Sequence, residues 1–308
     1  MQLGFVGLGA VVETAYLPAL RNLYGRPVRC FGFDVLPAKH PEGVTRCASL
    51  AELLATPLDT LFITTASLHH LEVLEQAIAS PISRIVIEKP IVATLPQIDK
   101  LNALLATPGA ASRVLALDHW MARIETAKRS LVDHFSDVVR IEGFLQEPSG
   151  YNAVGEPIAL NFSTGEPDTR TLRHPDGVIL DIGTHVLAML RETMRFLGGH
   201  DEMTLQVVAA KDRLGRAIAK GDLTTAEGEA HLQGSISGAE DVLEAIEGDD
   251  IQRWSLPGTI YEHCLAGHIL GDKSLFERDP QEVSRTTRRR IEEVALLLTL
   301  QQQLRGPH

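Results

Sequence analysis

Residues 2–12 read QLGFVGLGAVV, and this stretch decides the fold. A short apolar run ends in Gly7-Leu8-Gly9, and a helical pattern starts at Glu13. Glycines at that point allow a tight strand-to-helix turn and let a pyrophosphate approach the N–H groups at the helix start. Val12 stands where the full dinucleotide fingerprint has a third glycine, so an ordinary strand–helix turn of another doubly wound protein is the alternative.

An acidic residue ends the second predicted strand, Val28–Asp34. Asp34 stands close to the offset of about 20 residues expected of a carboxylate that binds the ribose of a dinucleotide. Such a carboxylate accepts hydrogen bonds from the 2′-hydroxyl and repels a 2′-phosphate. The pattern therefore predicts NAD as the cofactor, while Lys39 and His40 stand nearby and keep NADP possible.

Strand patterns and helix patterns alternate through residues 1–118. Buried apolar strands separated by helices predict a parallel sheet that is covered on both faces. We therefore expect an NAD(P)-binding Rossmann domain over 1–118, with a doubly wound α/β fold. The predicted strands are Leu3–Gly7, Val28–Asp34, Thr60–Thr64, Arg84–Glu88 and Val114–Leu117, and the predicted helices are Glu13–Leu23, Ser49–Ala55, Leu71–Ala79 and Leu95–Ala106.

Residues 119–308 follow a different pattern, in which strands alternate as if one face were solvated. We expect a substrate-binding and catalytic α+β domain there, with a mostly antiparallel open sheet. Residues 148–177 are rich in Gly, Pro, Asn, Ser and Thr, which is typical of a disordered segment or of an active-site cover. The predicted strands are Val138–Leu145, Thr204–Lys211 and Glu227–Ser235, and the predicted helices are Glu125–Phe135, Val178–Leu197, Thr259–Leu270 and Arg288–Leu304.

The composition is that of a folded globular protein: 44% of the 308 residues are hydrophobic and 22% are charged. A net charge of −11 disfavours a nucleic acid or an anionic membrane as partner. Three cysteines without a CxxC pair, no basic leader and no apolar run of the roughly 18 residues that a membrane span needs all favour a cytoplasmic protein. His263, Cys264 and His268 share one predicted helix, but no further ligand pair has convincing spacing, so no metal site is predicted.

Several motifs occur in a characteristic order: Gly7-Leu8-Gly9 followed by Leu17-Pro18-Ala19-Leu20, then residues 65–70 (TASLHH), Glu88-Lys89-Pro90, and residues 181–185 (DIGTH). Through these motifs the chain resembles the Gfo/Idh/MocA oxidoreductase family over nearly its whole length. Ala66 and Ser67 stand where that family usually has Pro and Asn. The resemblance implies dinucleotide contacts at Gly7, Leu8, Gly9, Ala10, Val11, Asp34, Thr65, Ala66, Ser67, His70, Glu88 and Lys89. It also implies a homodimer or homotetramer.

Three residues of these motifs have the chemistry of alcohol oxidation. Lys89 follows a buried strand at its carboxyl end, where it can bind a substrate hydroxyl and stabilise a developing alkoxide. Asp181 and His185 share one helix face, so the carboxylate can orient the imidazole while the imidazole takes the hydroxyl proton. The resemblance assigns all three these catalytic roles. Taken without it, Asp181 is a helix N-terminal charge, His185 a core histidine and Lys89 a solvated strand-end charge.

A second resemblance concerns residues 118–123 (DHWMAR), which are similar to the substrate-phosphate segment of glucose-6-phosphate dehydrogenases. It implies that His119 and Arg123 hold an anionic group of the substrate, with Trp120 between them. A guanidinium suits phosphate or carboxylate, and Arg170, Arg173 and His174 are further candidates. A hinge histidine and a surface arginine are the alternative interpretation.

The sequence thus predicts an NAD(P)-dependent dehydrogenase or reductase that moves a hydride between nicotinamide and a carbinol or carbonyl carbon. The expected substrate is a small polyhydroxylated molecule: a sugar, sugar phosphate or cyclitol derivative. Two alternatives stay open at this point. One is an imine or enone reductase on the same fold, and the other is a non-catalytic, dinucleotide-sensing regulatory protein.

Overall fold

The computed structural model describes residues 1–25, 27–119, 143–146, 149–151, 157–159, 177–196, 204–205, 229–232, 234–235 and 259–305. The chain forms two compact units. The first combines Met1–His119 with Thr259–Glu292, and the second combines Trp120–Gly258 with Glu293–His308. The predicted division assigned all of 119–308 to one domain, whereas residues 259–292 here return to the N-terminal unit.

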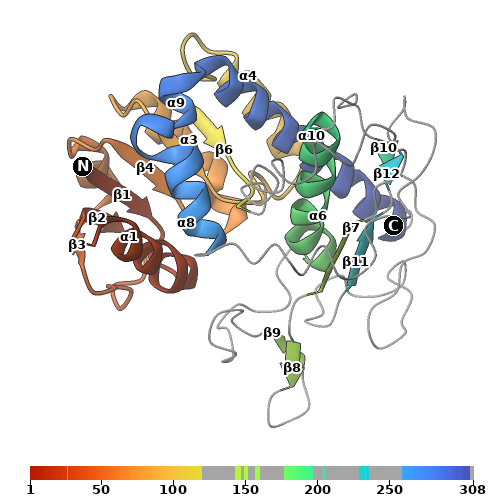
Figure 1. Cartoon of the computed structure of the whole chain (residues 1–308), viewed down its shortest axis with the longest axis horizontal. Coiled ribbons are helices and arrows are strands. Elements are labelled where there is room, and N and C mark those ends of the chain that lie inside the picture. Colours follow the sequence, from red (N-terminus) through yellow and green to blue (C-terminus); the bar gives the residue numbers. More distant parts are fainter. Residues whose placement is uncertain are drawn as a thin grey trace. The chain divides into compact units, whose positions relative to one another are not determined.

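The first unit is built on a parallel sheet of six strands in the order β3-β2-β1-β4-β5-β6 (Figure 1). This is the strand order of a Rossmann fold, and it confirms the predicted fold class. A short strand after β2, which the sequence pattern did not predict, forms one edge. The strands are β1 (Gln2–Val6), β2 (Arg29–Phe33), β3 (Val44–Arg46), β4 (Thr60–Ile63), β5 (Ile85–Ile87) and β6 (Val114–Ala116).

Helices cover both faces of this sheet. Successive side chains of a strand point to opposite faces, and every residue of β4, β5 and β6 is buried, so neither face of these strands is open to solvent. The second helix shows how local sequence sets an element. Ser49 accepts a hydrogen bond from the Glu52 N–H at 3.1 Å, and the Glu52 carboxylate accepts one from the Ala48 N–H at 2.6 Å, which together cap the helix start. The helices are α1 (Leu17–Tyr24), α2 (Leu50–Ala55), η2 (Ser67–His69), α3 (His70–Ala79) and α4 (Leu95–Leu105).

The helix after the glycine turn differs from the predicted regular helix. It begins with a π-helical turn, η1 (Val12–Tyr16), before α1. Pro18 lies in the first turn of α1 and has no N–H, so the regular ladder of backbone hydrogen bonds cannot run through this point. The helix ends, as predicted, at Gly25, whose φ is +59°.

The returning segment closes the sheet edge at β6. It comprises α8 (Ile260–Cys264), η3 (Leu265–Ile269), η4 (Gly271–Lys273), α9 (Leu275–Arg278) and the start of α10 (Pro280–Arg305). The Thr287 hydroxyl donates to the Val114 carbonyl at 2.7 Å and accepts from the Ala116 N–H at 3.0 Å. One side chain thus pairs backbone groups that a seventh strand would otherwise pair.

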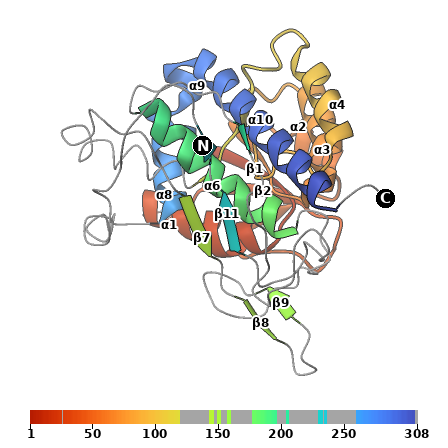
Figure 2. The same cartoon turned by 90° about the vertical axis from the view of Figure 1, so that its right-hand side faces the viewer.

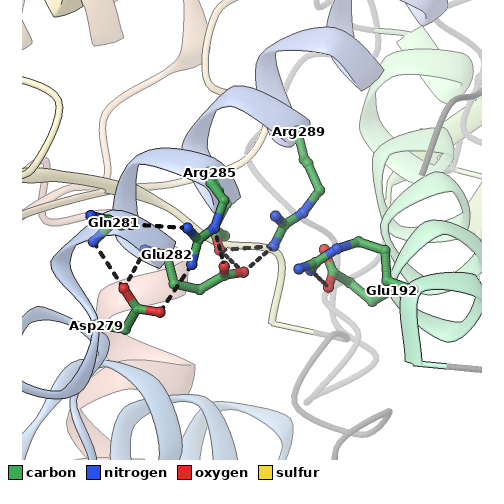
Figure 3. Close-up of polar contacts among 8 residues, drawn as sticks. Glu192, Asp279, Gln281, Glu282, Arg285 and Arg289 are labelled. Atoms are coloured by element: carbon green, nitrogen blue, oxygen red, sulfur yellow. Dashed lines mark hydrogen bonds and ion pairs between the residues drawn. The ribbon is translucent and has the colours of Figure 1, made fainter. Parts of the chain in front are cut away.

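The start of α10 carries a network of charged side chains (Figure 3). Asp279 accepts hydrogen bonds from the backbone N–H groups of Gln281 and Glu282 and binds Arg285 at 2.9 Å. Glu282 binds Arg285 at 2.7 Å and Arg289 at 2.6 Å. These N-terminal contacts let the helix start well before the predicted Arg288.

The second unit contains α6 (Gly177–Phe196), which packs against the antiparallel pair formed by β7 (Gly143–Gln146) and β11 (Glu229–Leu232) (Figures 1 and 2). Two further strand pairs are also antiparallel: β8 (Ser149–Tyr151) with β9 (Pro157–Ala159), and β10 (Thr204–Leu205) with β12 (Gly234–Ser235). The predicted helix Glu125–Phe135 lies outside the described residues. The described strand pairs agree with the predicted antiparallel character of this part of the chain.

Candidate dinucleotide and catalytic site

The predicted site residues of the first unit lie where parallel strands end. Gly7 follows β1, Asp34 follows β2, Thr65 lies just beyond β4, and Glu88 follows β5. The strands run parallel, so their carboxyl ends meet at one edge of the sheet. In open α/β sheets ligands bind at this edge, at the point where the strand order reverses. Here that point lies between β1 and β4.

The glycine turn has two glycines with different surroundings. Gly7 has φ +94°, and a Cβ atom there would lie 2.7 Å from the Thr65 nitrogen and 2.8 Å from the Thr64 carbonyl carbon. Gly7 is therefore required for the fold itself. At Gly9, by contrast, an added Cβ would meet no described atom within 4 Å. Gly9 leaves open space at a helix start, where the first N–H groups have no partner inside the helix.

Asp34 is held by the backbone on both carboxylate oxygens. Its Oδ2 accepts from the Leu8 N–H at 2.7 Å and its Oδ1 from the Leu36 N–H at 2.8 Å. The carboxylate is thereby fixed beside the glycine turn. Arg46, which the sequence analysis did not single out, donates to the Lys39 carbonyl at 2.6 Å and to the Asp34 carbonyl at 2.5 Å. A guanidinium on β3 thus braces the loop that follows Asp34.

The segment after β4 contains four of the predicted cofactor contacts. Thr65 is half-buried, Ala66 is exposed and Ser67 is buried. His70 is buried, and its two ring nitrogens lie 2.9 Å from the Pro90 carbonyl oxygen and 2.8 Å from the Thr65 carbonyl oxygen. His70 thus links the segment after β4 to the one after β5. Direct cofactor contact by these four residues stays a prediction.

A buried polar cluster lies beyond β5 and β6, and we call Tyr16, Glu88, His119 and Tyr261 the Tyr16 cluster. The Tyr16 hydroxyl donates to Glu88 Oε1 at 2.7 Å and lies 2.9 Å from His119 Nε2. His119 Nε2 is also 3.6 Å from Glu88 Oε1, and the His119 ring stacks on Tyr261 with centroids 4.0 Å apart. Half-buried Lys89 donates its backbone N–H to Glu88 Oε2 at 3.1 Å. The cluster ties Lys89 and His119 to η1.

Burial keeps Tyr16 in its protonated form. Removal from water, followed by the negative charge of Glu88, raises the pKa of Tyr16 well above its ordinary value. Tyr16 therefore keeps its proton and acts as a donor. Tyr16 was not among the predicted site residues, although a signal was present. Val12, Ala15, Tyr16 and Ala19 form an apolar stripe, and a buried tyrosine hydroxyl needs a hydrogen-bond partner.

The second unit carries the remaining predicted catalytic residues on α6. His185 is buried between Thr184 and Val186, both also buried. Asp181 lies one turn earlier on the same helix, and its side chain is outside the described residues. Further along, Arg191 lies 3.7 Å from Glu293 in an ion pair between buried side chains. Trp120, Arg123, Arg170, Arg173 and His174 are outside the described residues, as is most of the 148–177 loop.

Two features are absent from the described part of the chain. It contains no group of three or more His, Cys, Asp or Glu side chains arranged to hold a metal ion. No described helix combines the length and apolarity that a bilayer crossing requires.

No protein-family model and no curated protein matches the sequence at a significant level. Solved structures do match. An oxidoreductase from Thermotoga maritima is 14% identical with a TM-score of 0.57, over 99% of this chain and 96% of that one. An oxidoreductase from Bacillus cereus is 15% identical with a TM-score of 0.48, over 78% of this chain and 63% of that one. Levoglucosan dehydrogenase in complex with NADH is 16% identical with a TM-score of 0.47, over 69% of this chain and 56% of that one.

This chain therefore spans less than two thirds of the length of the last two proteins. At identities this low the likeness concerns the fold. The match to the Thermotoga maritima protein extends over nearly the whole of both chains, and it shows that the α/β Rossmann-like architecture is shared.

Proposed function

We propose that this protein is a nicotinamide-dinucleotide-dependent oxidoreductase that interconverts a carbinol and a carbonyl in a sugar, sugar phosphate or cyclitol derivative. One observation carries the proposal: open space at Gly9 lies beside a carboxylate, Asp34, that the Leu8 N–H fixes at the end of β2. A small turn at a helix start suits a pyrophosphate, and a fixed carboxylate next to it suits a ribose.

The residues of the turn fit a dinucleotide as ligand. Gly9, Ala10 and Val11 supply backbone N–H groups at the helix start, and Asp34 supplies the acceptor for ribose hydroxyls. A carboxylate there favours NAD, since a 2′-phosphate would be repelled. Residues 65–67 extend the proposed contact toward the nicotinamide end. When bound, the nicotinamide supplies the acceptor or donor of the hydride.

The chain's own residues supply the proton chemistry in this proposal. Lys89 binds the reacting hydroxyl, and its charge stabilises the oxygen as that oxygen becomes more negative. His185 takes the hydroxyl proton during oxidation and returns it during reduction, with Asp181 orienting the imidazole. Trp120, Arg123 and Arg170 complete the proposed substrate contacts, and His119, which is buried and bonds Tyr16, supports the site from within the Tyr16 cluster. These roles rest on the sequence resemblance.

The test of the dinucleotide site is a fluorescence titration with NADH, using a glycine pair as test and control. In Gly9→Ala the new methyl group occupies the open space and should weaken NADH binding about tenfold or more, because hydrogen bonds to a charged phosphate are lost. Gly267→Ala is the control, since a Cβ there also meets no described atom within 4 Å. Absence of NADH binding by the unmodified protein would overturn the proposal.

Turnover then separates an enzyme from a sensor. A panel of polyols and sugar phosphates is assayed with NAD and NADP. Lys89→Ala and His185→Ala should each lower kcat by about 10²-fold or more while NADH binding barely changes. Binding without turnover across the panel would instead support the dinucleotide-sensing alternative.

A further inference from the structure

Tyr16 lies in η1, directly after the glycine turn, yet its side chain reaches the residues that follow β5 and β6. The side chain is fully buried, at 0% exposure. Its ring lies 5.1 Å from that of Phe62 and 5.1 Å from that of Tyr261, measured between centroids, and contacts His119 edge-on at 5.5 Å. Aromatic packing thus holds the Tyr16 ring, and the polar contacts of this side chain are those of its hydroxyl.

The hydrogen bonds of this hydroxyl have one direction. The single proton of the Tyr16 hydroxyl is donated to Glu88 Oε1 at 2.7 Å. The Tyr16 oxygen then accepts from His119, which requires a proton on Nε2. Glu88 Oε2 meanwhile accepts the backbone N–H of Lys89. The result is a directed chain from His119 through Tyr16 to Glu88, with Lys89 anchored at its far end.

We propose that Tyr16 is a positioning residue of this site: its hydroxyl keeps the His119 proton on Nε2 and fixes the Glu88 carboxylate that anchors the Lys89 backbone. Besides Glu88 and His119, the ionisable groups that act on Tyr16 include Tyr261 of the Tyr16 cluster and Cys264 on α8. The consequence for catalysis rests on the proposed function. The hydrogen-bond chain itself does not, and it can be tested without substrate.

Nitrogen NMR of the full chain, with histidine labelled and His119 assigned by His119→Gln, tests the first part. The unmodified protein should show His119 with a proton on Nε2 that exchanges slowly with water. A neutral His119 protonated on Nδ1 alone would overturn the proposal without any variant of Tyr16.

Tyr16→Phe tests the hydroxyl, because it removes one oxygen and keeps the packed ring. The His119 Nε2 proton and the Lys89 backbone N–H should each exchange with water about tenfold faster, since each depends on a hydrogen bond that the hydroxyl holds in place. Tyr24→Phe makes the same chemical change at the end of α1 and should alter neither signal. Unchanged exchange in Tyr16→Phe, or equal changes in both variants, would mean that Tyr16 acts through packing alone.

The expected effect of Tyr16 on catalysis is tested by measuring kcat and the Kd of NADH for the same variant. Tyr16→Phe should lower kcat about tenfold and leave the Kd of NADH within about twofold, because the glycine turn keeps its own contacts. If the exchange rates change as expected but the unmodified protein turns over no substrate, the hydrogen-bond chain from His119 to Glu88 is supported and the proposed function fails. If turnover exists and Tyr16→Phe leaves kcat unchanged, the positioning role is wrong and the proposed function stands.

Discussion

The two ends of the sheet edge are built in opposite ways. Beside β1 and β2 the polar groups at this edge are backbone N–H groups and one carboxylate, that of Asp34, around open space at Gly9. Beyond β5 and β6 the polar groups are side chains, and Tyr16, Glu88 and His119 are all buried. Within one domain, the first region is open and the second is sealed by its own hydrogen bonds.

This difference separates two kinds of sensitivity to mutation. In the open region Gly9 has no described neighbour within 4 Å, and Asp34 is only half-buried, so water can reach the N–H groups that a substitution of Asp34 would release. A substitution there should therefore change ligand choice more than stability. In the sealed region the polar side chains bond one another, and removing one takes a hydrogen bond from its neighbours in a place where water does not readily replace it. Gly7 is the exception, because it belongs to the open turn but packs against the sheet.

The largest effect is expected for Gly7→Ala. The Cβ would lie within 2.8 Å of backbone atoms of Thr64 and Thr65, and the backbone is held at φ +94°. Overpacking and left-handed strain together should cost roughly 4 kcal/mol of unfolding free energy. Urea denaturation followed by circular dichroism measures it, with Gly9→Ala as the control that should unfold like the parent. Equal stability of both variants would show that the turn has freedom to relax at Gly7.

A smaller loss is expected for Glu88→Ala in the sealed region. It leaves the Tyr16 hydroxyl and the Lys89 N–H without their acceptor, which should cost about 2–3 kcal/mol of unfolding free energy. Glu75→Ala, an exposed glutamate on α3, should stay within about 0.5 kcal/mol of the parent in the same urea titration. A loss at Glu88 no greater than at Glu75 would mean that water replaces the missing carboxylate.

The smallest effect on stability, and a clear one on selectivity, is expected for Asp34→Ser. Removing the carboxylate lifts the repulsion of a 2′-phosphate, so the ratio of NADP to NAD affinity should rise by about tenfold, or about 1.4 kcal/mol. Calorimetric titration of both dinucleotides measures the ratio, and the melting temperature serves as the control. Tighter binding of NADP than of NAD by the unmodified protein would contradict the role given to Asp34.

Local signals predicted the first unit well. Apolar runs, the Ser49 cap and the stop at Gly25 located its strands and helices, and the fold class followed from their alternation. The sequence pattern did not predict β3, because three residues, Val44–Arg46, are too few to show the two-residue alternation of a strand. The sequence pattern also did not predict that residues 259–292 belong to this unit. Their place in it depends on contacts between residues far apart in the sequence, such as Thr287 with Val114.

Within the candidate site, only residues that belong to a recognisable motif could be named from the sequence. Gly7 and Asp34 were singled out because a glycine turn and a strand-end carboxylate have recognisable spacing, and Glu88 because it belongs to the Glu88-Lys89-Pro90 motif of the resemblance; their contact with a dinucleotide stays a prediction. Tyr16 and Arg46 were not, because their importance comes from partners that spacing does not reveal: a carboxylate 72 positions away for Tyr16 and two backbone carbonyls for Arg46.

The hydroxyl that finishes the β6 edge has a consequence for synthesis of the chain. Thr287 follows Val114 by 173 positions, so the ribosome synthesises all six strands long before it reaches the residue that bonds the β6 edge. At about 5–20 residues per second, that interval lasts roughly ten to thirty seconds. During this time the nascent sheet presents an unpaired strand, the kind of edge to which other chains add. Once Thr287 has been synthesised, its hydroxyl can pair the Val114 carbonyl and the Ala116 N–H at that edge.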